Sequence, residues 1–130
     1  MLHRDAIKAY QTAEQEFLVE GADPHSLVKM LYTELLASLE RASDALEQKD
    51  FVMKSSNLSK ALTILHVLAS SLDFERGGEI ATSLAQLYDW ARRKVIAASS
   101  SNARAEIVDV QKTVSEIATA WDQIAQGRAA

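Results

Sequence analysis

Apolar residues recur every three or four positions along almost the whole chain, which is the spacing of one face of an α-helix. Breaks in this spacing divide the chain into five helical segments. The first runs from Leu2 to about Leu18, carries a weak apolar stripe, and stops near Gly21, a residue type that often ends helices. We expect this short segment to form an arm beside the other four. Its stripe consists of Leu2, Ala6, Tyr10, Ala13 and Phe17.

The second and third segments carry stronger stripes. The second is expected to begin at Pro24, with Asp23 as a cap, and to end near Lys49, because aspartate and proline favour the first positions of a helix. The third is expected from Phe51 to Leu72. It has an unusually wide stripe, which predicts apolar surface left over for a partner. The stripe comprises Leu58, Leu62, Leu65, Leu68 and Leu72, with Ile64 and Val67 beside them.

Two glycines in the segment 74–78 predict a turn, so the fourth helix is expected from Glu79 to about Ala98. Its expected inner stripe is Ile80, Leu84, Leu87, Ala91, Val95 and Ala98. Tyr88 lies one position off that stripe, which predicts a hydroxyl in contact with water at the edge of the fold.

A second turn is expected at residues 99–102, where small polar residues follow one another. In the fifth helix the apolar positions alternate in steps of three and four, which is typical of helices that pack lengthwise in bundles. These positions are Ile107, Val110, Val114, Ile117, Trp121 and Ile124.

Four long helices with short connections favour antiparallel neighbours. We therefore predict an all-α fold, an antiparallel four-helix bundle formed by residues 23–126, with the N-terminal arm at residues 1–22. A chain of 130 residues suits one such domain. Its 4 glycines and 1 proline are too few for a fold with many strands.

Charge and composition narrow the classes of function. The net charge of −4 disfavours nucleic acid as a partner. Zero cysteines fit a reducing compartment, and the first twenty residues lack an apolar signal core, so we expect a cytoplasmic protein. The most apolar stretch, residues 58–72, is interrupted by Lys60 and His66, which argues against insertion in a membrane.

Catalytic and cofactor motifs are missing from the sequence. A di-iron bundle needs a glutamate three residues before a histidine, and neither His25 nor His66 has one. The sequence also has no phosphate-binding glycine loop, so we expect no metal, no cofactor and no enzymatic activity. The alternative that stays open is a phosphotransfer bundle, in which His25 would be phosphorylated with Lys29 one turn away.

Two stretches, ADPHSLVKMLY at 22–32 and LDFERGGEIATSLAQLYDWARR at 72–93, resemble the FliS family of flagellar secretion chaperones. The positions of Tyr10 and Trp121 support the resemblance. It implies a cytosolic protein that binds the disordered C-terminal segment of flagellin, prevents its premature polymerisation, and delivers it to the flagellar type III export apparatus. A disordered client of this kind can bury on the order of 1,000 to 3,000 Å². A weak homodimer stays open.

We expect the client to contact apolar and aromatic residues on the arm, the third helix and the fourth helix. For the leucines, burial in the core is the alternative to client contact, because an apolar stripe on a helix usually packs in the core. Whether the arm contacts the client or competes with it stays open, although we favour contact by Tyr10. The candidate residues are Ile7, Tyr10, Leu58, Leu65, Leu84, Leu87, Tyr88 and Arg92.

Overall fold

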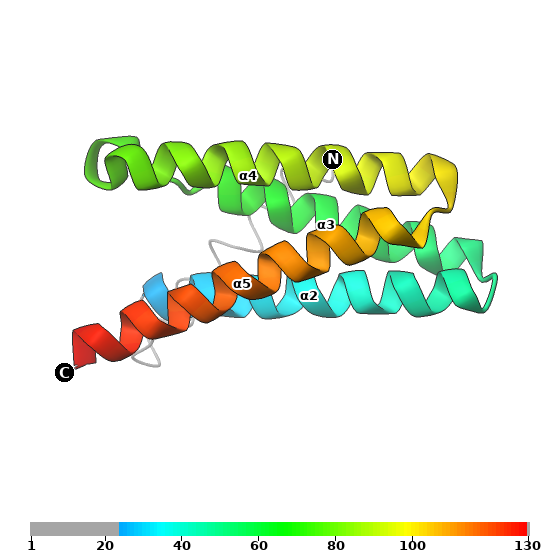
Figure 1. Ribbon diagram of the computed structural model, residues 1–130, viewed down its shortest axis with the longest axis horizontal. Helices are drawn as coiled ribbons and strands as arrows, with labels where there is room; N and C mark the ends of the chain where they lie inside the picture. Colours follow the sequence, from blue (N-terminus) through cyan, green and yellow to red (C-terminus); the bar gives the residue numbers. More distant parts are fainter. Residues whose placement is uncertain (1–23, 130) are drawn as a thin grey trace.

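The computed structural model describes the backbone of residues 24–129 and the side chains of residues 24–123. The described chain forms four long helices: α2 (Pro24–Glu47), α3 (Phe51–Ser70), α4 (Phe74–Ser101) and α5 (Arg104–Ala129). Consecutive helices run in opposite directions (Figure 1). The predicted all-α bundle is confirmed for this part of the chain. The arm expected at residues 1–22, with Ile7 and Tyr10, lies outside the described residues.

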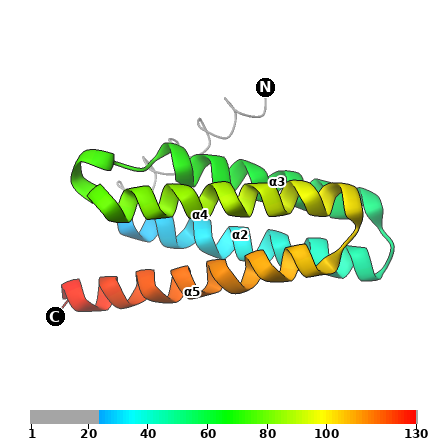
Figure 2. The ribbon, with the colours of Figure 1, turned by 45° about the horizontal axis from the view of Figure 1, so that its top comes forward.

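Each helix packs on two others. Helix α2 contacts α3 and α5, and α4 contacts α3 and α5, so the four helices enclose one core (Figure 2). Buried apolar side chains from all four helices meet there, as the helical stripes predict. The core comprises Tyr32, Leu35, Leu39, Ala42, Leu58, Ala61, Ile64, Leu65, Leu68, Tyr88, Ala91, Val95, Ala98, Ile107, Val110 and Val114.

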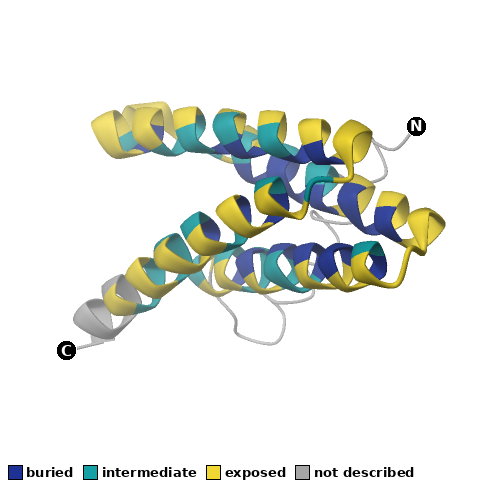
Figure 3. Ribbon diagram, turned by 45° about the vertical axis from the view of Figure 1, so that its right-hand side comes forward, coloured by how far each residue is buried: buried dark blue, intermediate teal, exposed yellow. Residues whose placement is uncertain are grey.

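Helix α5 diverges from α4 as it runs from their shared turn toward its C-terminal end (Figures 1 and 3). Its stripe follows the predicted spacing, but burial decreases along it. Ile107 and Val110 are fully buried, whereas Ile117 and Trp121 are only half-buried. The bundle is therefore closed at the α4–α5 turn and open at the other end.

The first connection lies close to its expected position, and the first and third connections each contain a residue in the left-handed conformation. Helix α2 ends at Glu47 and Lys49 takes a left-handed conformation, with φ 59°, before the next helix begins. The side chain of Asp50 then accepts a hydrogen bond from the backbone N–H of Met53, which caps α3. Asn102, with φ 55°, ends α4 in the same left-handed region.

The expectation that α4 begins at Glu79 is wrong. The side chain of Asp73 accepts hydrogen bonds from the backbone N–H groups of Glu75 and Arg76, and this cap starts a helical turn at Phe74. Gly78, with φ 51° and ψ −125°, then interrupts the helix. The glycine break is real, but it lies inside α4 as a kink.

The expected end of α4 at Ala98 is also wrong, because residues 99–101 continue the helix. Each of these serines donates its hydroxyl to the carbonyl four residues earlier, as Ser99 does to Val95 at 3.1 Å and Ser101 to Ala97 at 2.9 Å. This local bonding lets serine remain in a helix. Only Asn102 and Ala103 separate α4 from α5.

In the first half of α4 the inner face is shifted by one residue from its expected position, whereas Ala91, Val95 and Ala98 are buried as expected. Ile80, expected inside, is 72% exposed, and Ala81 is buried in its place. Tyr88, expected at the wet edge, is only 4% exposed and belongs to the core. The buried line steps through 81, 88, 91, 95 and 98, so it departs from the expected stripe only before Ala91.

The wide stripe of α3 does not leave the expected surplus of apolar surface. Ile64 and Val67, the two residues that widen it, are 7% and 5% exposed. The exposed large apolar residues of α3 are instead Phe51, Val52 and Met53 in its first turn. The width of the stripe thus reflects a helix buried over most of its circumference.

Candidate functional site

The open end of the bundle contains an apolar groove of about 530 Å³. It lies between the first half of α2, the α3–α4 connection, the first half of α4, and Trp121 of α5. Helix α5 diverges from α4 toward this end (Figure 1), and Trp121 there is only half-buried, whereas Ile107 and Val110 at the closed end are fully buried. The groove is lined by Val28, Tyr32, Leu68, Ser71, Leu72, Asp73, Arg76, Gly77, Ile80, Ala81, Leu84, Tyr88 and Trp121.

Two glycines shape the rim of the groove. A Cβ at Gly77 would lie 2.8 Å from the Cβ of Ala81, so only glycine allows the first turn of α4 to fold this closely onto the rest of the helix. Gly78 supplies the positive φ of the kink. The turn that they shape brings Arg76 and Gly77 to the lining of the groove.

An apolar ridge on α4 borders the groove on its outer side. We use this name for Ile80, Leu84 and Leu87, which share one helix face at steps of four and three residues. Ile80 is 72% exposed, and the other two are half-buried. Beyond the ridge lies a second, shallower hollow of about 350 Å³, lined by the ridge with Glu79 and Ser83.

Two of the residues that line the groove, Tyr32 and Tyr88, have hydroxyls in contact, and we call this pair the floor of the groove. The hydroxyl oxygens of Tyr32 and Tyr88 lie 2.6 Å apart, and the side chains are 1% and 4% exposed. Burial raises the pKa of both hydroxyls above the usual value of 10.0. The ring of Trp121 meets Tyr32 edge-on, with centroids 6.2 Å apart. This is a polar contact within apolar walls.

Trp121 lines the groove and is held in place by His25 of α2. Their rings stack with centroids 4.2 Å apart, and His25 Nε2 lies 3.0 Å from the carbonyl oxygen of Trp121. Lys29, the expected helper in phosphotransfer, pairs with Asp122 at 3.2 Å. The ring of His25 is thus engaged in holding α5 on α2, and this geometry gives no support to the phosphotransfer alternative.

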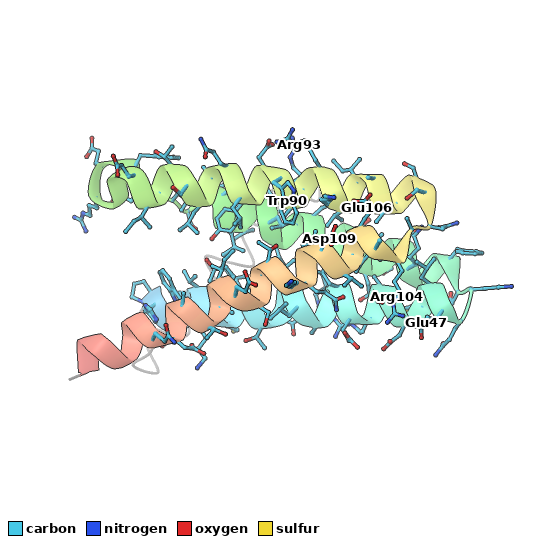
Figure 4. All side chains as sticks on the ribbon, in the orientation of Figure 1. Glu47, Trp90, Arg93, Arg104, Glu106 and Asp109 are labelled. Atoms are coloured by element: carbon cyan, nitrogen blue, oxygen red, sulfur yellow. The ribbon has the colours of Figure 1, made fainter. Side chains whose placement is uncertain are left out.

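Ion pairs hold α4 and α5 together at the closed end (Figure 4). Lys94 Nζ lies 3.1 Å from Glu106 and 3.4 Å from Asp109, and it lies 5.8 Å from the ring centroid of Trp90. The hydrogen bond that Lys94 donates to the Glu106 carboxylate is the main cause of the raised pKa at Lys94. These contacts restrict the separation of the two helices to the other end.

Arg104, at the start of α5, joins that helix to α2. Its guanidinium pairs with Glu47, as their facing positions show in Figure 4, and it donates to the hydroxyl of Ser43 at 2.8 Å. The closed end is therefore fixed on both sides of α5.

Seven of the eight candidate residues predicted from the sequence divide into three groups. Leu84, Leu87 and Tyr88 line the groove or the hollow beside it. Leu58 and Leu65 are 1% and 2% exposed and lie in the core. A core role was the alternative to client contact for these two leucines. Ile7 and Tyr10 lie outside the described residues.

Arg92 lies on the outer surface of α4. It donates to Asp89 at 3.0 Å, and Arg93 pairs with the other oxygen of Asp89 at 3.0 Å. The hydrogen bond from Arg92 is the main reason that the pKa of Asp89 lies below its usual value. Arg92 lines a small pocket beside Tyr88, on the side toward α3.

The sequence analysis did not assign Val28, Tyr32, Leu72, Ile80 or Trp121 to the site, although all five line the groove. Most of them belong to apolar stripes and resemble core positions in a linear pattern. For Ile80 and Trp121 the sequence did contain a clue, namely their place near the start of α4 and the end of α5. Where two helices diverge, apolar residues at inner positions stay uncovered.

Within residues 24–123 no three histidine, cysteine, aspartate or glutamate side chains gather where a metal ion could be held. In the same part of the chain, no helix is both long and apolar enough for a membrane span.

Comparison with known proteins gives a consistent result. Residues 6–128 match the family model described as Flagellar protein FliS. The flagellar secretion chaperone FliS of Salmonella typhimurium is 42% identical over 125 residues, which cover 95% of this chain and 93% of that protein. FliS of Vibrio cholerae is 35% identical, covering 93% and 89%. The chaperone FliSB of Pseudomonas aeruginosa is 34% identical, covering 92% and 94%.

Proposed function

Because this chain belongs to the FliS family of flagellar secretion chaperones, we propose that it binds the C-terminal segment of flagellin in the cytosol, prevents premature polymerisation, and delivers it to the flagellar type III export apparatus. The observation that carries this proposal is the open apolar groove with the exposed ridge beside it. The role is one of binding without catalysis.

The groove and the ridge suit a client that is disordered when free. Two hollows lie on either side of Ile80 and Leu84, so a segment with apolar residues spaced along it can bury side chains on both sides of the ridge. Ordering such a client costs several kcal/mol, which keeps the complex reversible at the export apparatus. Covering a segment that packs in the filament also blocks assembly before export.

We assign direct client contact to Leu84, Leu87 and Tyr88, with Ile80 and Trp121 added from the geometry. Leu58 and Leu65 support the groove from inside, since both are buried. Arg92 contributes a charged rim on the far side of Tyr88.

The test is calorimetric titration with a C-terminal peptide of about 40 to 60 residues from the flagellin of the same organism. Binding should show a negative heat-capacity change, because apolar surface leaves water. Ile80→Ser should weaken binding about tenfold or more, as expected for one buried aliphatic side chain. Val52→Ser is the matched control, because Val52 is also exposed, at 84%, but lies at the closed end.

Absence of heat and of any mobility change at tens of micromolar peptide would refute the proposed function. Equal losses in Ile80→Ser and Val52→Ser would place the client elsewhere on the bundle.

The arm contributes to the proposal through Ile7 and Tyr10. Removal of residues 1–20 should weaken binding if Tyr10 contacts the client. A truncated protein that binds more tightly would show instead that the arm competes for the groove. Sedimentation of the free protein over a concentration series tests the weak homodimer.

A further inference from the structure

We propose that the hydroxyl pair of Tyr32 and Tyr88 donates one hydrogen bond to a main-chain carbonyl of the client segment that lies in the groove. This inference rests on the proposed function, and it specifies what the floor of the groove recognises. It makes the two tyrosines specificity-determining residues for the conformation of the bound segment.

The tyrosine pair has two O–H groups, and the hydrogen bond between them uses only one. Each tyrosine has one O–H that can donate, and the two oxygens lie 2.6 Å apart, which is the length of one hydrogen bond. One hydroxyl donates to the other, and the accepting hydroxyl retains its own hydrogen for a third group. Because burial keeps both hydroxyls protonated, this donor is present at every pH near neutrality.

The remaining O–H can reach a partner only from the groove. Both tyrosines line the groove, and their other surfaces are packed in the core, where the two side chains are 1% and 4% exposed. The surrounding walls are apolar, with Val28, Leu68 and Leu72 among them. A client that fills the groove therefore supplies the third group.

The acceptor for this O–H is a backbone carbonyl of the client. Apolar walls favour apolar client side chains, which carry no acceptor, but every residue brings a backbone carbonyl. A carbonyl buried without a partner costs free energy, so a client that places one on the hydroxyl pair is favoured over a client that does not.

The pairing selects a backbone conformation. Carbonyls inside a helix are already bonded to the N–H four residues later, whereas those of extended chain and of the last helical turn are not. The segment above the tyrosines is therefore extended or at the C-terminal end of a short helix. A client that continued as a helix through this point would leave the donor unpaired.

The experiment combines two kinds of substitution. Tyr32→Phe, Tyr88→Phe and the double variant are titrated with the flagellin peptide, and thermal melting of each variant gives the folded fraction. The double variant should remain folded, because replacing both partners of a buried hydrogen bond by apolar groups of the same shape is often nearly neutral. It should bind roughly 5-fold to 150-fold more weakly per folded molecule. Each single variant should lose less, because one hydroxyl remains to donate.

The second kind of substitution replaces single backbone amides of the peptide by esters, whose carbonyls are weaker acceptors. We expect one position at which the ester weakens binding to the wild-type protein but has little further effect on the double variant. Such coupling isolates the contact from any general loss of stability.

The outcomes separate the two proposals. Wild-type affinity in the double variant, or ester effects that are the same in both proteins at every position, would overturn the hydroxyl contact while the effect of Ile80→Ser still supports binding in the groove. Failure of the wild-type protein to bind any flagellin peptide would overturn both proposals.

Discussion

His25 and Trp121 exchange two hydrogen bonds although they are 96 positions apart in the chain. His25 Nε2–H donates to the carbonyl oxygen of Trp121 at 3.0 Å, and Trp121 Nε1–H donates to the carbonyl oxygen of His25 at 2.9 Å. The pair ties the first turn of α2 to the diverging half of α5. Since Trp121 also lines the groove, this tie sets the width of the groove at its open end.

Loss of this tie should loosen α5. Trp121→Phe keeps an aromatic ring but removes the Nε1–H donor, and it should lower the free energy of unfolding by about 1 kcal/mol. Hydrogen exchange should become faster in the second half of α5 and stay unchanged near the α4–α5 turn. Trp90→Phe is the control, because Trp90 lies beside Lys94 at the closed end. Unchanged exchange in α5 of Trp121→Phe would contradict the assigned role.

Removal of the Tyr88 side chain should destabilise the bundle. Tyr88→Ala creates a cavity in the core and leaves the Tyr32 hydroxyl without its partner, so the expected loss is about 3 to 5 kcal/mol. At the wet edge of the fold, where the sequence pattern placed Tyr88, the same substitution would leave the free energy of unfolding nearly unchanged. Urea unfolding decides between the two, and a wild-type midpoint for Tyr88→Ala would mean that the residue is not part of the core.

Lys54, near the start of α3, should contribute to the stability of the bundle, although lysine side chains are usually exposed. It is 2% exposed, and its ammonium group donates to the carbonyl of Ser99 and the side chain of Asn102, where α4 ends. Lys54→Met should cost about 1 to 3 kcal/mol, because it removes the hydrogen bonds of a buried ammonium group to two part-buried acceptors. Lys60→Met, in a surface ion pair with Glu34 at 3.0 Å, should change stability by less than about 1 kcal/mol. Equal effects in urea unfolding would refute the capping role.

Gly78 should resist substitution for a reason of backbone conformation alone. A Cβ there would meet nothing within 4 Å, but φ 51° with ψ −125° is a combination that other residues adopt only with strain. Gly78→Ala should lower the free energy of unfolding by about 1 to 3 kcal/mol. Ser83→Ala, at an exposed position later in α4, should leave it nearly unchanged. An unchanged denaturation midpoint in Gly78→Ala would show that the kink relaxes without cost.

Stability should fall in alkaline solution because of the tyrosine pair. The folded state raises the pKa of Tyr32 and Tyr88 above the usual 10.0, so the unfolded chain loses these protons first as the pH rises. Above about pH 10 the folded state holds more protons, and stability decreases by up to roughly 1.4 kcal/mol per pH unit for each tyrosine. Urea unfolding from pH 8 to 11 should show a smaller slope in the Tyr32→Phe/Tyr88→Phe variant. Identical slopes would contradict the assignment.

Local sequence signals determined much of the fold. The periodic apolar positions predicted the helices of the described chain, since an amphipathic stripe must be buried against neighbours. The start of α3 at Phe51 matched the structure, and α2 and α3 each ended two residues before the expected position. The predicted ends of α4 were wrong because of two local interactions that the sequence pattern does not reveal. These are the Asp73 cap and the hydrogen bonds of the serine hydroxyls within the helix.

The sequence by itself determined the helical bundle and, through the stretch 72–93, the resemblance to a family that the comparisons confirm. Only the tertiary structure decided which inner positions stay covered. Ile107 and Trp121 belong to the same stripe of α5, yet one is fully buried and the other is half-buried beside a groove. The difference arises because ion pairs of Lys94 hold α4 and α5 together at one end, while the tie between His25 and Trp121 holds α5 to α2 at the other. Such contacts join residues far apart in the chain, and a linear pattern of apolar positions contains no information about them.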